Sequence, residues 1–124
     1  MKKIITQNAP AAIGPYSQAI SANGFIFGSG QIPLTPNGEI ISENVSEQTH
    51  QVMKNIKAVL NEAGSSLDNI VKTTIFLKDI NDFAKVNEIY ASYFTSDIKP
   101  ARSTVGIANL PKNVLVEIEY IAKA

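Results

Sequence analysis

The hydrophobic and polar positions of the N-terminal half follow the period of a strand first and that of a helix afterwards. Two β-rich runs, residues 16–21 and 25–30, flank Asn23 and Gly24. An Asn-Gly pair between such runs predicts a tight β-hairpin, because both residues accept positive φ angles. Apolar residues then recur at helical spacing over residues 44–64, with an asparagine cap at the start and a glycine at the end. This part of the chain is therefore predicted to form a hairpin followed by a long helix.

The second half of the chain repeats this change of period. Residues 70–78 alternate like a strand with one buried face, and residues 81–94 return to helical spacing with one amide, Asn87, on the apolar side. Residues 101–108 and 114–122 are both strand-like, and the five residues between them suit a hairpin or a short link. The pattern therefore predicts another strand, a second helix and two final strands.

This order of elements predicts an α+β fold in which two helices pack on one face of a single mixed sheet. At 124 residues the chain has the length of one domain, which we expect to span residues 1–124. No element is left to cover the second face of the sheet. Because apolar residues are expected on that face as well, the chain is predicted to form a closed homo-oligomer.

Composition narrows the classes of function. A net charge of zero and the even spread of the lysines argue against a broad surface for nucleic acid. No apolar run approaches the ~18 residues of a membrane span, so we expect a soluble cytoplasmic protein. There is no cysteine, and the one histidine, His50, is expected near the solvated face of the first helix. A zinc site or a His-dependent triad would need partners that the sequence does not offer, so no metal is expected.

The candidate chemistry begins with Arg102, the only arginine of the chain. It is either half of a structural ion pair or a planar fork for an anion such as a carboxylate. Glu117 and Glu119 share one face of the last strand. That face is either the solvated side of an edge strand, or it is partly covered and its acids need a partner. Symmetric pairing of the last two strands would place Arg102 opposite Tyr120 and Glu117 on the other face. A bulge or a shift of one residue would instead bring Arg102 and Glu117 together.

Three further positions each carry two interpretations. Ser29 and Gly30 end a strand that bends, or they offer backbone amides to a ligand. Asn87 is an amide at the border of the core or a residue of a site. Tyr16 is a packing residue with a satisfied hydroxyl or a part of that same site. The residue pattern leaves these alternatives open.

Five segments match, in order and spacing, the motifs of one family. They read IGPYSQAI, SGQIP, DFAKVNEIY, KPARSTV and LPKNVLVEIEYIA, and the resemblance that they carry covers essentially the whole chain from Ala9 to Ala122. The chain thereby resembles the Rid family of enamine and imine deaminases, also called YjgF or RidA. The resemblance implies a chorismate-mutase-like fold and a barrel-like homotrimer with its sites in clefts between subunits. In such an assembly Arg102 and Glu117 need not meet within one chain.

The resemblance also implies roles for individual residues. Arg102 would bind the substrate carboxylate and Glu117 would position a water molecule. The residues implied to line the cleft are Tyr16, Ser29, Gly30, Asn87, Arg102, Ser103 and Thr104. Many relatives have a cysteine where Thr104 stands, so thiol-based activities are not expected here, whereas hydrolysis does not need that thiol.

The implied reaction is the hydrolysis of reactive enamines and imines. 2-Aminoacrylate and 2-aminocrotonate, released by pyridoxal-phosphate enzymes, would react as 2-iminopropanoate and 2-iminobutanoate to give 2-oxo acids and ammonia. The imine is already electrophilic, so positioning and modest acid–base help suffice and no cofactor is expected. The alternative is a non-catalytic trimer that binds 2-oxo acids or other carboxylates in the same cleft, as a regulator or a chaperone. RNA cleavage, attributed to some relatives, is disfavoured by the zero net charge.

Overall fold

The first elements form where local signals predict them. In the computed structural model, which describes residues 1–124, Asn23 and Gly24 have φ angles of 52° and 82° and join β2 (Ala19–Ala22) to β3 (Phe25–Gln31). This confirms the predicted hairpin. Helix α1 (Val45–Glu62) begins after Asn44, whose side chain accepts a hydrogen bond of 2.9 Å from the backbone N–H of Glu47. Gly64 follows its end with a φ of 77°, a left-handed conformation that favours glycine.

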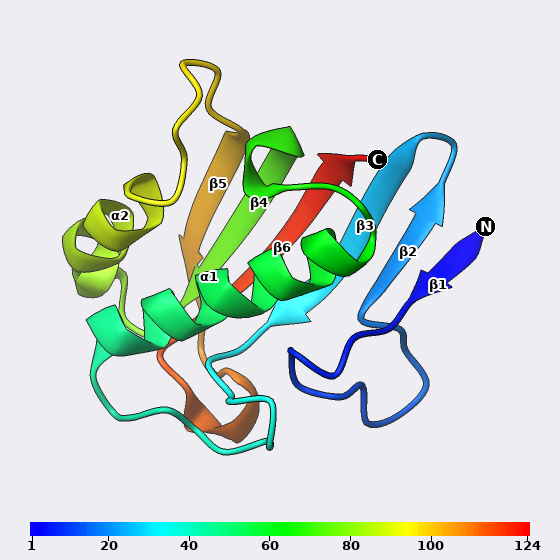
Figure 1. Cartoon of the computed structure of the whole chain (residues 1–124). Coiled ribbons are helices and arrows are strands. Elements are labelled where there is room, and N and C mark those ends of the chain that lie inside the picture. The colour runs from blue at the N-terminus through cyan, green and yellow to red at the C-terminus, as the bar shows by residue number, and fades with distance from the viewer.

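The later elements complete a six-stranded mixed sheet with the order β1-β2-β3-β6-β4-β5 (Figure 1). Only β4 and β5 pair in parallel, and helix α2 connects them. All other neighbours pair antiparallel. Short 3₁₀ turns lie at Leu67–Asn69, Ile80–Asp82 and Pro111–Asn113. The remaining elements are β1 (Lys2–Ile4), β4 (Ile70–Leu77), α2 (Phe83–Ala91), β5 (Ala101–Gly106) and β6 (Val116–Lys123).

The last two strands do not form a hairpin, so that alternative of the sequence analysis is wrong. The crossover through α2 places β5 on the outer side of β4, and β6 enters the sheet between β3 and β4. β6 pairs antiparallel with both of these strands, which gains hydrogen bonds on both of its edges. The segment between β5 and β6 is therefore a link that passes the end of β4, as the second alternative expected.

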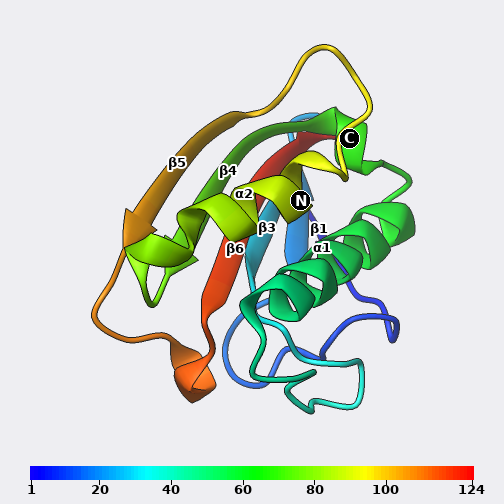
Figure 2. The ribbon, with the colours of Figure 1, turned by 90° about the vertical axis from the view of Figure 1, so that its left-hand side faces the viewer.

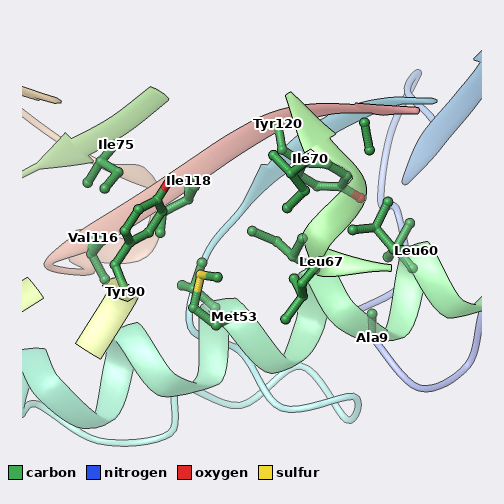
Figure 3. Packing of buried hydrophobic residues seen from close by; sticks show 14 of the residues in the cluster. Ala9, Met53, Leu60, Leu67, Ile70, Ile75, Tyr90, Val116, Ile118 and Tyr120 are labelled. Carbon is green, nitrogen blue, oxygen red and sulfur yellow. The ribbon is translucent and has the colours of Figure 1, made fainter. Parts of the chain in front are cut away.

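Both helices cover the same side of the sheet (Figures 1 and 2), as predicted. The side chains buried between the layers come from α1, α2 and the inward positions of the central strands (Figure 3). Ile75, Ile118 and Met53 are at most 1% exposed. Burial of this apolar surface is the main driving force for folding. None of the helices is long and apolar enough to cross a membrane.

The second face of the sheet carries apolar side chains without a covering layer. Phe25 and Phe27 on β3 remain 41% and 46% exposed, and Val105 on β5 is 41% exposed. Cross-strand pairing places Ile121 beside Phe27, and Phe76 beside Val105. We refer to the sheet side that carries these residues as the open face. Its apolar character agrees with the pattern on which an oligomer was predicted.

Candidate functional site

Arg102 lies on edge strand β5, and its side chain is directed under helix α2. Its Nη1 donates a hydrogen bond of 2.6 Å to Oδ1 of Asn87. The guanidinium carbon lies 5.4 Å from the ring centre of Phe83 and 5.2 Å from that of Tyr90. These partners are an amide and two aromatic rings, so the cation is held by neutral groups and not by a structural ion pair. The remaining N–H groups of the guanidinium suit a planar anion.

The three partners of Arg102 come from one stripe of α2. Phe83, Asn87 and Tyr90 recur at helical spacing, which places them on the same face of the helix. Asn87 was predicted on the apolar side of this helix, and its amide there accepts from the arginine. A hollow of about 340 Å³ adjoins the guanidinium, and its border is formed by Asn87, Tyr90, Ala91, Phe94, Lys99, Pro100 and Arg102.

Glu117 lies on the opposite face of the sheet from Arg102. Arg102 pairs with Thr73, and Thr73 pairs with Tyr120, so these three residues share the helix-covered side. Glu117 pairs with Phe76 and therefore lies on the open face. Arg102 is thus aligned with Tyr120 across the sheet. Symmetric pairing of β5 with β6 would have aligned the same two residues, but in the structure β4 lies between their strands. Within one chain, Arg102 and Glu117 do not form a pair.

The carboxyl group of Glu117 is half-buried beside β3. Burial raises its pKa, and repulsion from the nearby Glu119 raises this pKa further. Gly30 makes room for the carboxyl group, because a Cβ atom built on Gly30 would lie 2.9 Å from the carboxyl carbon. The glycine of SGQ is therefore explained by the approach of a carboxylate. A carboxyl group with a raised pKa binds a proton more readily than a solvated one.

The bend that brings Gly30 to Glu117 is a register shift in β3 between Gly28 and Gln31. It confirms the interpretation of this segment as a strand end that bends. Ser29 faces the N-terminal loop, where its backbone N–H donates to Gln18 O at 3.0 Å and its Oγ donates to Ser17 O at 2.5 Å. The amide of Ser29 is therefore already bonded within the chain.

Tyr16, Ser29 and Gly30 border one hollow of about 630 Å³. The Tyr16 side chain is 53% exposed, and its hydroxyl accepts a hydrogen bond of 3.3 Å from Ile13 N. The rest of the border includes Lys112, a residue that sequence reasoning missed. Lys112 and Asn113 have φ angles of 54° and 57°, which are uncommon for residues other than glycine. Asparagine adopts this conformation more readily than most residues, whereas no pattern in the sequence signals it for Lys112.

The residues after Arg102 alternate between the two faces of the sheet. Ser103 lies toward the open face, where its Oγ accepts a hydrogen bond of 3.1 Å from Lys72 Nζ. Thr104 returns to the side of Arg102, and its Oγ1 is buried without a hydrogen-bond partner. Apart from Ser103, which lies in neither, the predicted site residues thus form two groups in one chain. The α2 group consists of Arg102, Asn87 and Thr104, and the β3 group consists of Tyr16, Ser29, Gly30 and Glu117.

His50 differs from its predicted position near the solvated face. It is partly buried, and its Nδ1 lies 2.7 Å from the hydroxyl of Tyr93 with the two rings edge to face. Tyr93 follows the end of α2. Its contact with His50 is a tertiary contact, which the helical periodicity of α1 alone does not reveal. No cluster of three or more His, Cys, Asp or Glu side chains is arranged to hold a metal ion.

Comparison with known proteins places this arrangement in a family. The family model described as Endoribonuclease L-PSP matches residues 6–124. The chain is 57% identical to AldR of Lactococcus lactis, whose name describes a regulator, over 99% of this chain and 98% of AldR. It is 50% identical to the 2-iminobutanoate/2-iminopropanoate deaminase of Salmonella typhimurium, over 98% of this chain and 96% of that protein.

Solved structures agree in fold. YyfA of Yersinia pestis, described as a member of the conserved Rid protein family, superimposes with a TM-score of 0.97 at 56% identity, over 99% of this chain and 98% of that one. TdcF of Escherichia coli, solved with bound serine, superimposes with a TM-score of 0.93 at 44% identity, over 100% of this chain and 99% of that one. The mixed sheet, its two helices and the matched motifs together show that the chain belongs to the Rid (YjgF/RidA) family.

Proposed function

We propose that this protein is a 2-iminobutanoate/2-iminopropanoate deaminase whose single Rid-family domain, residues 1–124, clears reactive imines in the cytoplasm. The proposal rests on the surroundings of the Arg102 guanidinium. Its guanidinium is held by Asn87, Phe83 and Tyr90, which are all neutral, so its charge remains available to an anionic substrate. A bidentate guanidinium suits the planar carboxylate of a 2-imino acid. The name of the Salmonella relative supports the same reaction.

The assembly that we propose is a barrel-like homotrimer in which the α2 group of one subunit meets the β3 group of its neighbour. Two features support this arrangement. Arg102 and Glu117 lie on opposite faces of the sheet in one chain, so a shared site needs a second copy. The open face also carries exposed Phe25 and Phe27, which a partner subunit would cover.

The proposed reaction starts when Arg102 binds the carboxylate, while Asn87, Tyr16, Ser29, Gly30, Ser103 and Thr104 line the site. An enamine substrate first takes up a proton at carbon to become the iminium ion, the protonated form of the imine. Glu117 accepts a proton from a water molecule as the water oxygen forms a bond to the imine carbon. The resulting carbinolamine receives that proton on nitrogen, and its C–N bond breaks as the hydroxyl proton passes to Glu117 and the carbonyl group forms. Ammonia leaves and a 2-oxo acid remains, with no step that requires a metal or a cofactor.

The test is the release of ammonia and 2-oxo acid from 2-aminocrotonate or 2-aminoacrylate generated in situ. Wild-type protein is expected to exceed the spontaneous rate, and Arg102→Ala is expected to lose this acceleration. Glu117→Gln is expected to abolish turnover but to keep affinity for 2-oxobutanoate. A wild-type rate equal to the spontaneous one would refute the deaminase.

A mixing experiment tests the shared site separately. If Arg102 and Glu117 act from neighbouring subunits, random trimers of Arg102→Ala and Glu117→Gln chains regain about a quarter of the wild-type sites, because half the chains carry each intact residue. If both residues acted from one chain, the mixture would stay inactive. Light scattering of the wild-type protein gives the subunit number independently.

The second candidate is a carboxylate-binding regulator or chaperone-like trimer without turnover. The name of AldR and the bound serine of TdcF favour it for this family. This function needs Arg102 and does not need Glu117. A protein that binds 2-oxobutanoate but does not accelerate imine hydrolysis, and whose binding survives Glu117→Gln, would be of this class.

A further inference from the structure

Arg102, Thr73 and Tyr90 form a closed triangle across three elements. Thr73 on β4 is the backbone partner of Arg102 on β5. The Thr73 Oγ1 lies 2.7 Å from the hydroxyl oxygen of Tyr90, and the Tyr90 ring returns to Arg102 with its centre 5.2 Å from the guanidinium carbon. Figure 3 shows the Tyr90 ring pointing from α2 toward the sheet. Thr73 therefore contacts both of the other residues, and the Tyr90 ring lies beside the Arg102 guanidinium.

Two corners of this triangle, Thr73 and Tyr90, are buried. Thr73 is 1% exposed and Tyr90 is 6% exposed, and the Tyr90 ring also packs against Phe94 with ring centres 4.8 Å apart. A buried hydroxyl that loses its partner is costly, so the Thr73 bond holds the Tyr90 ring in one orientation. The third corner, Arg102, is exposed, and a free arginine side chain would sample many rotamers. The ring supplies a surface for the guanidinium and leaves free the in-plane N–H groups that do not bond Asn87.

We infer that Tyr90, anchored by Thr73, is a positioning residue that holds the Arg102 guanidinium ready for the substrate carboxylate. The role of Arg102 as carboxylate clamp rests on the proposed function. A guanidinium ordered before binding loses less side-chain freedom when the ligand arrives, so ordering improves affinity. It affects the binding of the carboxylate in substrate and transition state alike, and therefore changes KM more than kcat.

The variants separate the ring from the hydroxyl. Tyr90→Leu removes the aromatic surface, and we expect KM for the imine and Kd for 2-oxobutanoate to rise about two- to fivefold, with kcat nearly constant. Tyr90→Phe keeps the ring but loses the bond to Thr73, so both constants are expected to rise by less than in Tyr90→Leu, to about twice the wild-type values. Tyr93→Phe is the matched control, because it deletes a hydroxyl with a contact of equal length, 2.7 Å to His50, without touching Arg102.

Arg102 also offers a direct reporter, because it is the only arginine of the chain. Its Nε–H group gives the single arginine signal of this type in ¹⁵N NMR spectra. We expect an order parameter near that of rigid backbone, roughly 0.85, in wild type, a lower value in Tyr90→Phe, and a value below about 0.6 in Tyr90→Leu. A role of Tyr90 in stability alone would lower Tm without changing this signal.

The outcomes distinguish this inference from the proposed function. An ordered Nε–H group and unchanged 2-oxobutanoate affinity in folded Tyr90→Leu would overturn the positioning role, whatever the deaminase assay gives. If Tyr90→Leu does not fold, Thr73→Val replaces it. That variant keeps the volume, frees the Tyr90 hydroxyl, and must weaken affinity and Nε–H order relative to Tyr93→Phe. Loss of order in these variants, in a protein that never accelerates imine hydrolysis, would support the inference and reject the deaminase.

Discussion

Substitution of Gly30 by alanine tests whether the space beside β3 exists for the Glu117 carboxylate. The new Cβ would lie 2.9 Å from the carboxyl carbon and 3.1 Å from the Cγ of Glu117. Relaxed contacts between carbon atoms begin near 3.5 Å, so the carboxyl carbon must retreat by roughly 0.6 Å or more. The end of a half-buried glutamate can rotate, so the free energy of unfolding should fall by only about 1 kcal/mol. A displaced base of this kind should reduce kcat about 100-fold.

Gly28→Ala is the natural contrast, because its Cβ would overlap the ring of Tyr120 instead. That ring is 2% exposed and cannot move aside, so we expect a loss of about 1–3 kcal/mol in unfolding free energy. Urea denaturation and ammonia release are measured on both variants. Gly30→Ala should be stable and inactive, while folded Gly28→Ala should be unstable and active. Wild-type kcat in Gly30→Ala would refute the role assigned to this glycine and to the position of the Glu117 carboxylate.

Three further predictions concern charge and capping. Burial, and secondly repulsion from Glu119, raise the pKa of Glu117. Because a general base must be deprotonated, kcat/KM should fall as the pH drops through this pKa. Glu119→Gln removes the repulsion, lowers the pKa of Glu117 and should shift this acid limb to lower pH; a limb that stays in place would contradict the assignment. Arg102→Lys keeps the charge but not the fork, and Kd for 2-oxobutanoate should rise at least about tenfold in calorimetry. Asn44→Ala should lower the unfolding free energy by about 1 kcal/mol in urea, and no change would contradict the cap observed at α1.

The predictions that held rest on local signals. Asn23 and Gly24 turn the first hairpin because their backbone tolerates positive φ, whatever the rest of the chain does. Asn44 begins α1 for an equally local reason, a side-chain oxygen that reaches a free N–H of the first turn. The stripe of α2 that carries Asn87 follows from helical periodicity alone.

The predictions that failed depend on which distant segments pair. Alternation shows that residues 114–122 form a strand, but it does not say which neighbours that strand takes, and β6 takes β3 and β4 instead of β5. The separation of Arg102 from Glu117 agrees with one of the two alternatives that the sequence left open, although β4 lies between their strands. His50 was misplaced because Tyr93, from another helix, covers part of its ring. The residues of the candidate site could be recognised from sequence motifs. Their division into two groups became visible only in the three-dimensional structure.

The insertion of β6 between β3 and β4 also constrains how the chain folds during synthesis. β6 is the last of the six strands to leave the ribosome, yet it occupies the middle of the sheet. Until it arrives, β3 and β4 have no partner on their facing edges, and the apolar sides of α1 and α2 have an incomplete sheet to cover. A nascent chain must therefore remain unfinished, with exposed strand edges that favour aggregation, until the VEIEY segment is available. The strand that carries Glu117 is thus also the one whose arrival allows the sheet to close.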